Sequence, residues 1–122
     1  MKRPIFNDIT AYQGDTLEFT FTIEDPNGNA VDLSQFTNIA WVLSTGTQLS
    51  TTEGTLAING NDISGTRYAD EMEIPVRGYY YELKFYRSPV DRITWGAGQF
   101  NVIDGDDQQG STLNEFTLQI EP

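Results

Sequence analysis

Paired acidic side chains are the first groups in this sequence whose types and spacing could do chemistry. Glu71 and Glu73 stand two residues apart in a segment that we expect to be a strand, so both carboxylates would project from the same face. Glycosidases use two carboxylates, but these flank the scissile bond at a set separation and usually come from different strands or loops. The spacing alone therefore gives little support to catalysis.

Composition removes most other catalytic mechanisms. The 122-residue chain contains neither His nor Cys, which excludes Ser-His-Asp and Cys-His centres and any metal held by His or Cys. An aspartic protease needs Asp-Thr-Gly or Asp-Ser-Gly, and only Asp15-Thr16-Leu17 occurs. We therefore expect a protein that is not an enzyme and that needs no cofactor.

Two oxygen-rich segments resemble calcium loops only weakly. In residues 25–32 the Gly stands at the fourth position rather than the sixth and no Glu follows at the twelfth, so a plain turn is the better interpretation. The second segment contains Asp104, Asp106 and Asp107, and a solvated acidic linker explains it equally well. These three carboxylates are weak calcium candidates.

The charge of the chain restricts its partners. Eighteen acidic residues against seven basic ones give a formal net charge of −11, which opposes a nucleic-acid backbone and an anionic membrane surface. No apolar run follows Met1-Lys2-Arg3-Pro4, so we expect neither a signal peptide nor a transmembrane helix. Close self-association would have to use apolar surface or place the few Lys and Arg side chains at the contact.

Apolar residues alternate with polar ones along much of the chain, which predicts strands. Residues 17–23 have the pattern of a strand with one buried face, and residues 25–29 supply the Pro and Asn-Gly of a turn. Val31 and Leu33 begin a return strand, and residues 39–43 form a candidate central strand because both of their faces are apolar.

A second strong strand is predicted over residues 78–87, followed by a turn at residues 88–91 and a returning strand. Gly96 and Gly98 interrupt the returning strand and predict a bulge or bend. Shorter strands are expected around residues 56–58 and 72–76. Residues 44–54 read as an exposed connection or a mobile hairpin tip. No segment has a sustained helical period, and strands at this spacing predict an all-β, Ig-like antiparallel β-sandwich of about seven to nine strands.

The C-terminal part has two interpretations. A sandwich over residues 1–103 would be followed by an acidic polar linker at 104–112 and a final strand at 113–122. That strand either pairs at the edge of the same sandwich or adds a strand to a neighbouring subunit.

Three surface features are candidates for binding a partner. Tyr80 and Tyr86 would lie on the outward face of the strand at 78–87, where aromatic rings anchor interfaces or stack on sugars, although Tyr also suits a strand that packs beneath a loop. Arg87 and Arg92 bracket the turn and form a comparatively basic corner. The third feature is the C-terminal strand, whose apolar side chains are Phe116, Leu118 and Ile120.

Several of these segments resemble a known family. The string Tyr-Gln-Gly-Asp-Thr-Leu at residues 12–17, the Phe-Thr-Phe-Thr-Ile strand, the turn at 25–29 and Val-Asp-Leu at 31–33 look like the opening of Ig-like domains in tailed-bacteriophage virion proteins. Baseplate upper proteins and related tail or capsid-associated proteins carry such openings. The segments Gly-Tyr-Tyr-Tyr-Glu-Leu at 78–83 and Trp-Gly-Ala-Gly-Gln-Phe-Asn-Val at 95–102 are similar to the closing part of those domains.

The resemblance covers most of residues 9–103 and implies a non-enzymatic structural protein of a virion, made in the host bacterial cytoplasm. Its partners would be other virion proteins in the tail, the baseplate or the capsid, or further copies of the same chain in a homo-oligomer. The alternative is a carbohydrate-binding module that serves adhesion to the host surface through Tyr80 and Tyr86, with or without calcium at Asp104.

Overall fold

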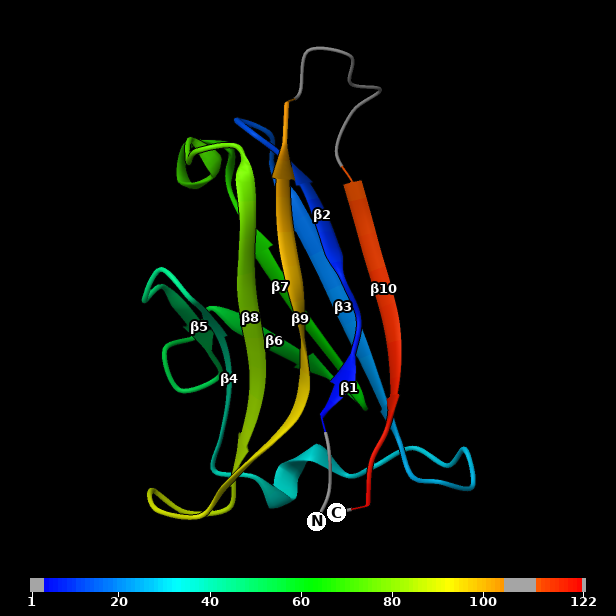
Figure 1. The fold of residues 1–122 in the computed structure, drawn as a ribbon. Coiled ribbons are helices and arrows are strands. Elements are labelled where there is room, and N and C mark those ends of the chain that lie inside the picture. Colours follow the sequence, from blue (N-terminus) through cyan, green and yellow to red (C-terminus); the bar gives the residue numbers. More distant parts are fainter. Residues whose placement is uncertain (1–3, 105–111, 122) are drawn as a thin grey trace.

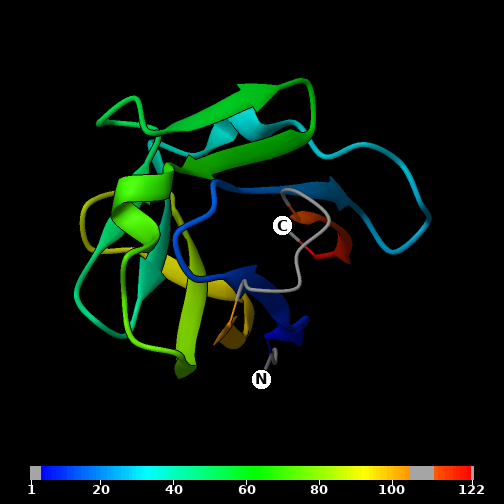
Figure 2. The same ribbon diagram turned by 90° about the horizontal axis from the view of Figure 1, so that it is seen from above.

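Two β-sheets pack face to face in the computed structural model, which describes residues 4–104 and 112–121 (Figure 1). Sheet A contains β1 (Ile5–Phe6), β2 (Ile9–Tyr12), β4 (Asn38–Leu43), β5 (Gln48–Ser50), β8 (Arg77–Tyr86) and β9 (Arg92–Ile103). Sheet B contains β3 (Leu17–Glu24), β6 (Leu56–Asn59), β7 (Asp62–Arg67) and β10 (Thr112–Gln119). Figure 2 shows the sheets as separate layers. The predicted all-β sandwich is confirmed, with ten strands in the described residues rather than seven to nine.

Both sheets are mixed rather than wholly antiparallel. Sheet A has the order β1-β9-β8-β4-β5 with β2 also on β9, and sheet B has the order β10-β3-β7-β6. The pairs β1–β9, β2–β9 and β10–β3 are parallel. The chain crosses between sheets and reverses direction from β2 to β3 and again from β9 to β10. Parallel pairing of β2 with β9 in one sheet therefore requires parallel pairing of β3 with β10 in the other.

The two strongest predicted strands, β3 and β8, each supply four side chains to the core. The inward side chains of β3 are at most 1% exposed and those of β8 at most 4% exposed; these are Leu17, Phe19, Phe21 and Ile23, and Tyr79, Tyr81, Leu83 and Phe85. Trp41 from β4 joins them, with its ring centroid 4.9 Å from that of Phe19 and 5.8 Å from that of Tyr81. Aromatic packing of this kind adds to the apolar area removed from water, so these rings hold the two layers together.

The bulge predicted in the returning strand is present. The pairing of β8 with β9 shifts register between Leu83 and Lys84, which face Gly96 and Thr94. Trp95 is therefore the extra residue, and its neighbour Gly96 lies where a Cβ atom would come within 3.1 Å of Leu83 and Leu118 side-chain atoms.

The return strand expected at Val31 and Leu33 is wrong. Only a single bridge joins Glu24 to Ala30, and Leu33 begins the 3-10 helix η1 (Leu33–Gln35), whose first turn is capped by the Asp32 carboxylate. The chain then crosses to sheet A, and β3 pairs instead with β7. The sequence pattern missed β7 because two of its three inward positions are Gly65 and Arg67 rather than large apolar residues.

The strand expected over residues 72–76 is also wrong. Residues Ala69–Met72 form the 3-10 helix η2, in which the Glu71 carboxylate accepts a hydrogen bond from the Tyr68 backbone N–H at 3.0 Å. Met72 is fully buried and anchors this helix to the core. Glu71 and Glu73 therefore do not share one face of a strand, as a carboxylate pair would require.

Tyr81 fixes the segment between β1 and β2 onto sheet A. Its hydroxyl donates to the Asn7 carbonyl oxygen at 2.5 Å, and the Asn7 N–H donates to the Ala97 carbonyl at 3.0 Å. Gly98 permits this approach, because a Cβ atom there would collide with the same Asn7 carbonyl oxygen. Burial of the phenol, together with the nearby charge of Asp8, raises the pKa of Tyr81.

We expect stability to fall in alkali because of this raised pKa. In the unfolded chain Tyr81 loses its proton near its ordinary pKa of about 10, whereas the folded protein holds the proton to higher pH. The contribution is therefore fully present below about pH 10 and is lost as pH rises toward the folded pKa. Urea denaturation of the wild type and of Tyr81→Phe between about pH 8 and 11 measures it. Tyr81→Phe should lose stability less steeply with pH; identical slopes would show that Tyr81 does not contribute.

Candidate interaction surface

The outer face of sheet A carries two strongly exposed aromatic rings. Phe6 on β1 is 70% exposed and Tyr80 on β8 is 64% exposed. Strand register places Phe6 opposite Ala97, and Ala97 opposite Glu82. These three side chains form one row across the sheet, and Tyr80 stands in the next row.

A hollow lies between the two rings because Ala97 contributes only a methyl group to its row. The hollow has a volume of about 300 Å³ and a mainly apolar lining, which includes Pro4, Phe6, Val42, Ser44, Tyr80 and Glu82. Ser44 holds the Tyr80 backbone, since its Oγ accepts from the Tyr80 N–H at 3.1 Å and its own N–H donates to the Tyr80 carbonyl at 2.7 Å. We call this feature the Phe6/Tyr80 hollow. Exposed aromatic rings around a concave apolar surface are typical of interface anchors.

Charged groups stand at the rim of the hollow. The Glu82 carboxylate is 3.5 Å from the Lys84 ammonium on the same face of β8. The Lys84 side chain is 20% exposed and that of Glu82 is 51% exposed, so the carboxylate is the more accessible of the two groups for orienting a partner.

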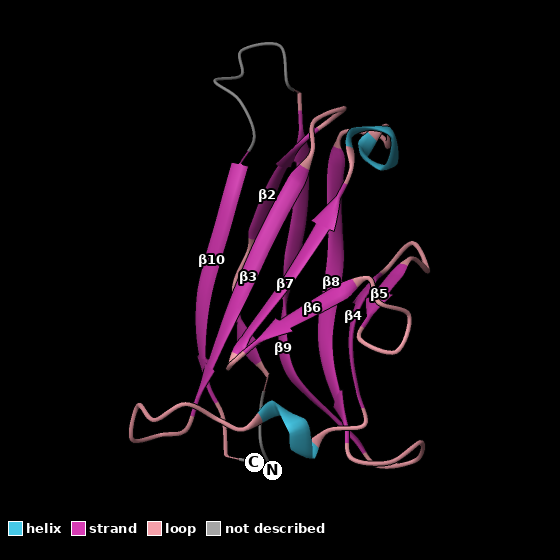
Figure 3. Ribbon diagram, turned by 180° about the vertical axis from the view of Figure 1, so that it is seen from behind, coloured by secondary structure: helices cyan, strands magenta, loops and turns pink. Residues whose placement is uncertain are grey.

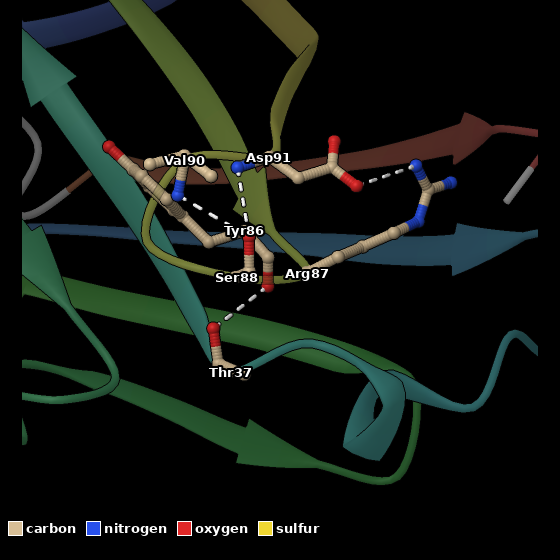
Figure 4. Close-up of polar contacts among 6 residues, drawn as sticks. All are labelled: Thr37, Tyr86, Arg87, Ser88, Val90 and Asp91. Atoms are coloured by element: carbon tan, nitrogen blue, oxygen red, sulfur yellow. Dashed lines mark hydrogen bonds and ion pairs between the residues drawn. The ribbon is translucent and has the colours of Figure 1, made fainter.

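Tyr86 does not join Tyr80 in one platform. The two side chains lie six residues apart on β8, a distance of about 20 Å along a strand. Tyr86 is half-buried, and its carbonyl accepts from the Thr37 N–H at 2.8 Å and from the Thr37 hydroxyl at 3.2 Å (Figure 4). It therefore belongs to the end of the sheet where β8 turns into β9.

Arg87 and Arg92 flank the turn at residues 88–91, as expected. Ser88 Oγ accepts from the N–H groups of Val90 and Asp91 at 3.3 Å and 3.1 Å (Figure 4). Arg87 lies 3.8 Å from the Asp91 carboxylate, and its guanidinium is 5.8 Å from the centroid of the Trp95 ring. Arg92 is exposed at the start of β9. The corner is basic, although Asp91 offsets part of its charge.

The C-terminal strand pairs at the edge of its own sandwich, the first of the two expected placements. It runs parallel to β3 from Thr112, opposite Leu17, to Gln119, opposite Glu24. Leu118 is fully buried, Ile120 is 2% exposed, and the ring of Phe116 packs on Phe21 with 5.4 Å between centroids. These three candidate partner-binding side chains therefore pack against the core of their own chain.

Asn114 closes the seam between β10 and sheet A. Its Nδ2 donates to the Thr10 carbonyl at 3.2 Å, and its Oδ1 accepts from the Thr10 N–H at 3.4 Å. One side chain thus satisfies both backbone groups of a residue in β2.

The calcium candidates receive no support from the described residues. Asp106 and Asp107 lie outside them, and Asp104 is exposed just after β9. Residues 4–104 and 112–121 contain no cluster of three or more acidic side chains arranged to hold a metal ion. The Asp25 carboxylate accepts from the backbone N–H groups of Asn29 and Asn27, which lowers its pKa, so this segment is a turn.

Two further facts bear on the setting of the protein. Among the residues that the structure describes, no helix has the length and apolar character needed to cross a membrane. No protein-family model matches the chain, and no curated protein matches it either.

Proposed function

We propose that this protein is a non-enzymatic structural component of a tailed-phage particle that docks on repeated neighbouring subunits through the outer face of sheet A. The Phe6/Tyr80 hollow is the observation that supports docking, because exposed apolar surface bordered by polar groups marks interaction sites. The phage setting rests on the resemblance of residues 12–33 and 78–102 to Ig-like virion domains. Tail, baseplate and capsid decoration all fit this role.

The docking mechanism combines anchoring with repetition. Each buried aromatic side chain contributes about 150–250 Å² of contact area, so Phe6 and Tyr80 can anchor a modest interface. Glu82 and Lys84 at the rim would set its orientation, since charged rims contribute mainly to specificity and association rate. Many copies on one particle compensate for a small individual contact.

Quantitative mass spectrometry of purified particles tests this proposal. Particles from host cells that carry the gene would be separated by density and washed at high salt before digestion. We expect peptides of this chain in a fixed ratio to the major capsid or tail protein from one preparation to the next. A chain that is abundant in the lysate and missing from the particles would contradict the proposal.

A carbohydrate-binding module is the second candidate because of the same exposed ring. Tyr80 presents an aromatic face beside Glu82 and the Ser44 hydroxyl, a combination that fits one sugar ring. Glycan-array binding that is reproducible and lost on replacement of Tyr80 would favour this role. Loss of glycan binding in the presence of a chelator would indicate that calcium takes part in the binding.

A further inference from the structure

Within residues 4–104 and 112–121, the surface cations belong to one hairpin. The described residues contain five basic side chains, namely Arg67, Arg77, Lys84, Arg87 and Arg92. Arg67 is 5% exposed and lies between the sheets. The other four belong to β8, β9 and the turn that joins them, and Lys84 and Arg92 stand on the outward positions of sheet A. The guanidinium groups of Arg77 and Arg87 lie over the rings of Tyr79 and Trp95, so the outer face of sheet A presents two cations of the described residues, Lys84 and Arg92.

The outer face of sheet B has the opposite character. Its outward positions on β3, β7 and β10 alternate with inward ones, and most of them carry carboxylates or hydroxyls; the exceptions by register are Leu113 beside Glu18 and Gln119 beside Glu24. The carboxylates are Glu18, Glu24, Asp62 and Glu115; the hydroxyls are those of Thr20, Thr22, Ser64, Thr66 and Thr117. No cation of the described residues lies among them. Figure 3 shows these strands from behind, without a helix over them.

This acidic face is also well ordered. Thr22 donates to the Asp62 carboxylate at 2.6 Å, and the hydroxyls of Thr20 and Ser64 lie 3.3 Å apart. Register places Glu115 beside Thr20 and Thr117 beside Thr22. The result is an array of methyl, hydroxyl and carboxylate groups on three neighbouring strands.

We propose that copies of this chain stack face to back, with the outer face of sheet A in one copy on the outer face of sheet B in the next. This inference rests on the proposed function and names the repeated neighbour as a second copy. The contact brings Lys84 and Arg92 toward the carboxylates around Glu18 and Glu115. Phe6 and Tyr80 bury their rings against threonine methyl groups, while the Tyr80 hydroxyl meets hydroxyl and carboxylate acceptors.

The alternatives with like faces together are less favourable. A contact between two sheet A faces would bring the cations of one copy against those of the other, with Glu82 as the acidic group beside the hollow. A contact between two sheet B faces would bring carboxylates against carboxylates. Like charges in direct apposition disfavour a contact. The overall charge of −11 opposes any association, but at physiological salt it is screened beyond about 8 Å, so the charges at the contact decide the arrangement.

A face-to-back contact uses two different surfaces of each copy. Such a heterologous contact closes into a ring or continues as an open stack, depending on the rotation between copies. It also predicts complementation, because a copy with a defective sheet A face still offers an intact sheet B face.

Sedimentation velocity of the purified full chain tests this arrangement. The sheet A variant is Tyr80→Thr, which removes the ring and keeps a strand-forming residue; the sheet B variant is Glu115→Lys. Val76→Thr is the control, since Val76 is 49% exposed and precedes β8, outside both faces. Unchanged urea midpoints would show that each variant folds.

We expect the wild type and Val76→Thr to associate as concentration rises in about 0.15 M salt, where the net charge is screened, and to dissociate in about 0.5 M salt, where the contact charges are screened as well. Tyr80→Thr and Glu115→Lys alone should associate at least about ten-fold more weakly. Their equimolar mixture should form a heterodimer that does not grow, because it contains one intact contact.

Three results would overturn the inference: a wild type that stays monomeric in about 0.15 M salt, a Glu115→Lys variant that associates as strongly as the wild type does, or a mixture that stays monomeric. A chain that is present in particles and yet monomeric in solution overturns the stacking and leaves the proposed function standing.

Discussion

Replacing Leu118 with alanine is expected to lower the free energy of unfolding by about 2–5 kcal/mol. Leu118 is fully buried. Its Cδ1 atom packs against Gly96 of the opposite sheet, 3.1 Å from the position that a Cβ atom at Gly96 would take. Loss of the isobutyl group removes apolar burial and leaves a cavity in a core that aromatic rings cannot easily refill. Chemical denaturation of the purified chain measures the change.

Thr117→Ala is the matched control for this prediction. Thr117 is the preceding residue of the same strand, but its side chain is exposed, so its replacement should change the free energy of unfolding by less than about 0.5 kcal/mol. Equal stabilities of the wild type and Leu118→Ala would contradict the placement of β10 in its own core and would favour a strand that docks on a neighbour. Deletion of the tail cannot separate these cases, because it also removes core residues.

The sequence predicted the parts of the fold that show an uninterrupted alternation. β3 and β8 each place four large apolar residues on one face, and the pattern identified both strands and their inward sides. β7 was missed because Gly65 and Arg67 occupy inward positions, and residues 72–76 were wrongly expected to be a strand because Met72 and Ile74 alternate with carboxylates. In both cases contacts with distant segments determine the structure, and such contacts produce no periodic pattern of apolar residues in the local sequence.

The candidate site was predicted in part for a similar reason. Tyr80 was identified because it stands on the outward side of a clear strand. Phe6 was missed, since β1 has two residues and so short a strand has no periodicity. The apolar residues of the C-terminal strand were assigned to both the core and a partner, because an edge strand and a donated strand have the same alternation. Pairing with β3 distinguishes them, and pairing is not a property of the segment alone.

Replacing Tyr80 with threonine is expected to weaken docking with little effect on folding. The ring is 64% exposed in the isolated chain, so its removal costs little core packing, and threonine keeps the strand propensity. At an interface, truncation of an anchoring Tyr typically costs about 2 kcal/mol or more, which corresponds to roughly a thirty-fold loss of affinity. Phe6 and the backbone contacts of Ser44 would remain in place.

Competition for places in the particle tests the central claim most directly. Host cells would produce equal amounts of the wild type and one variant, and mass spectrometry would measure their ratio in purified particles. We predict that the wild type exceeds Tyr80→Thr by at least about ten to one and that Val76→Thr enters as often as the wild type. Equal incorporation of Tyr80→Thr and the wild type would contradict docking through the outer face of sheet A.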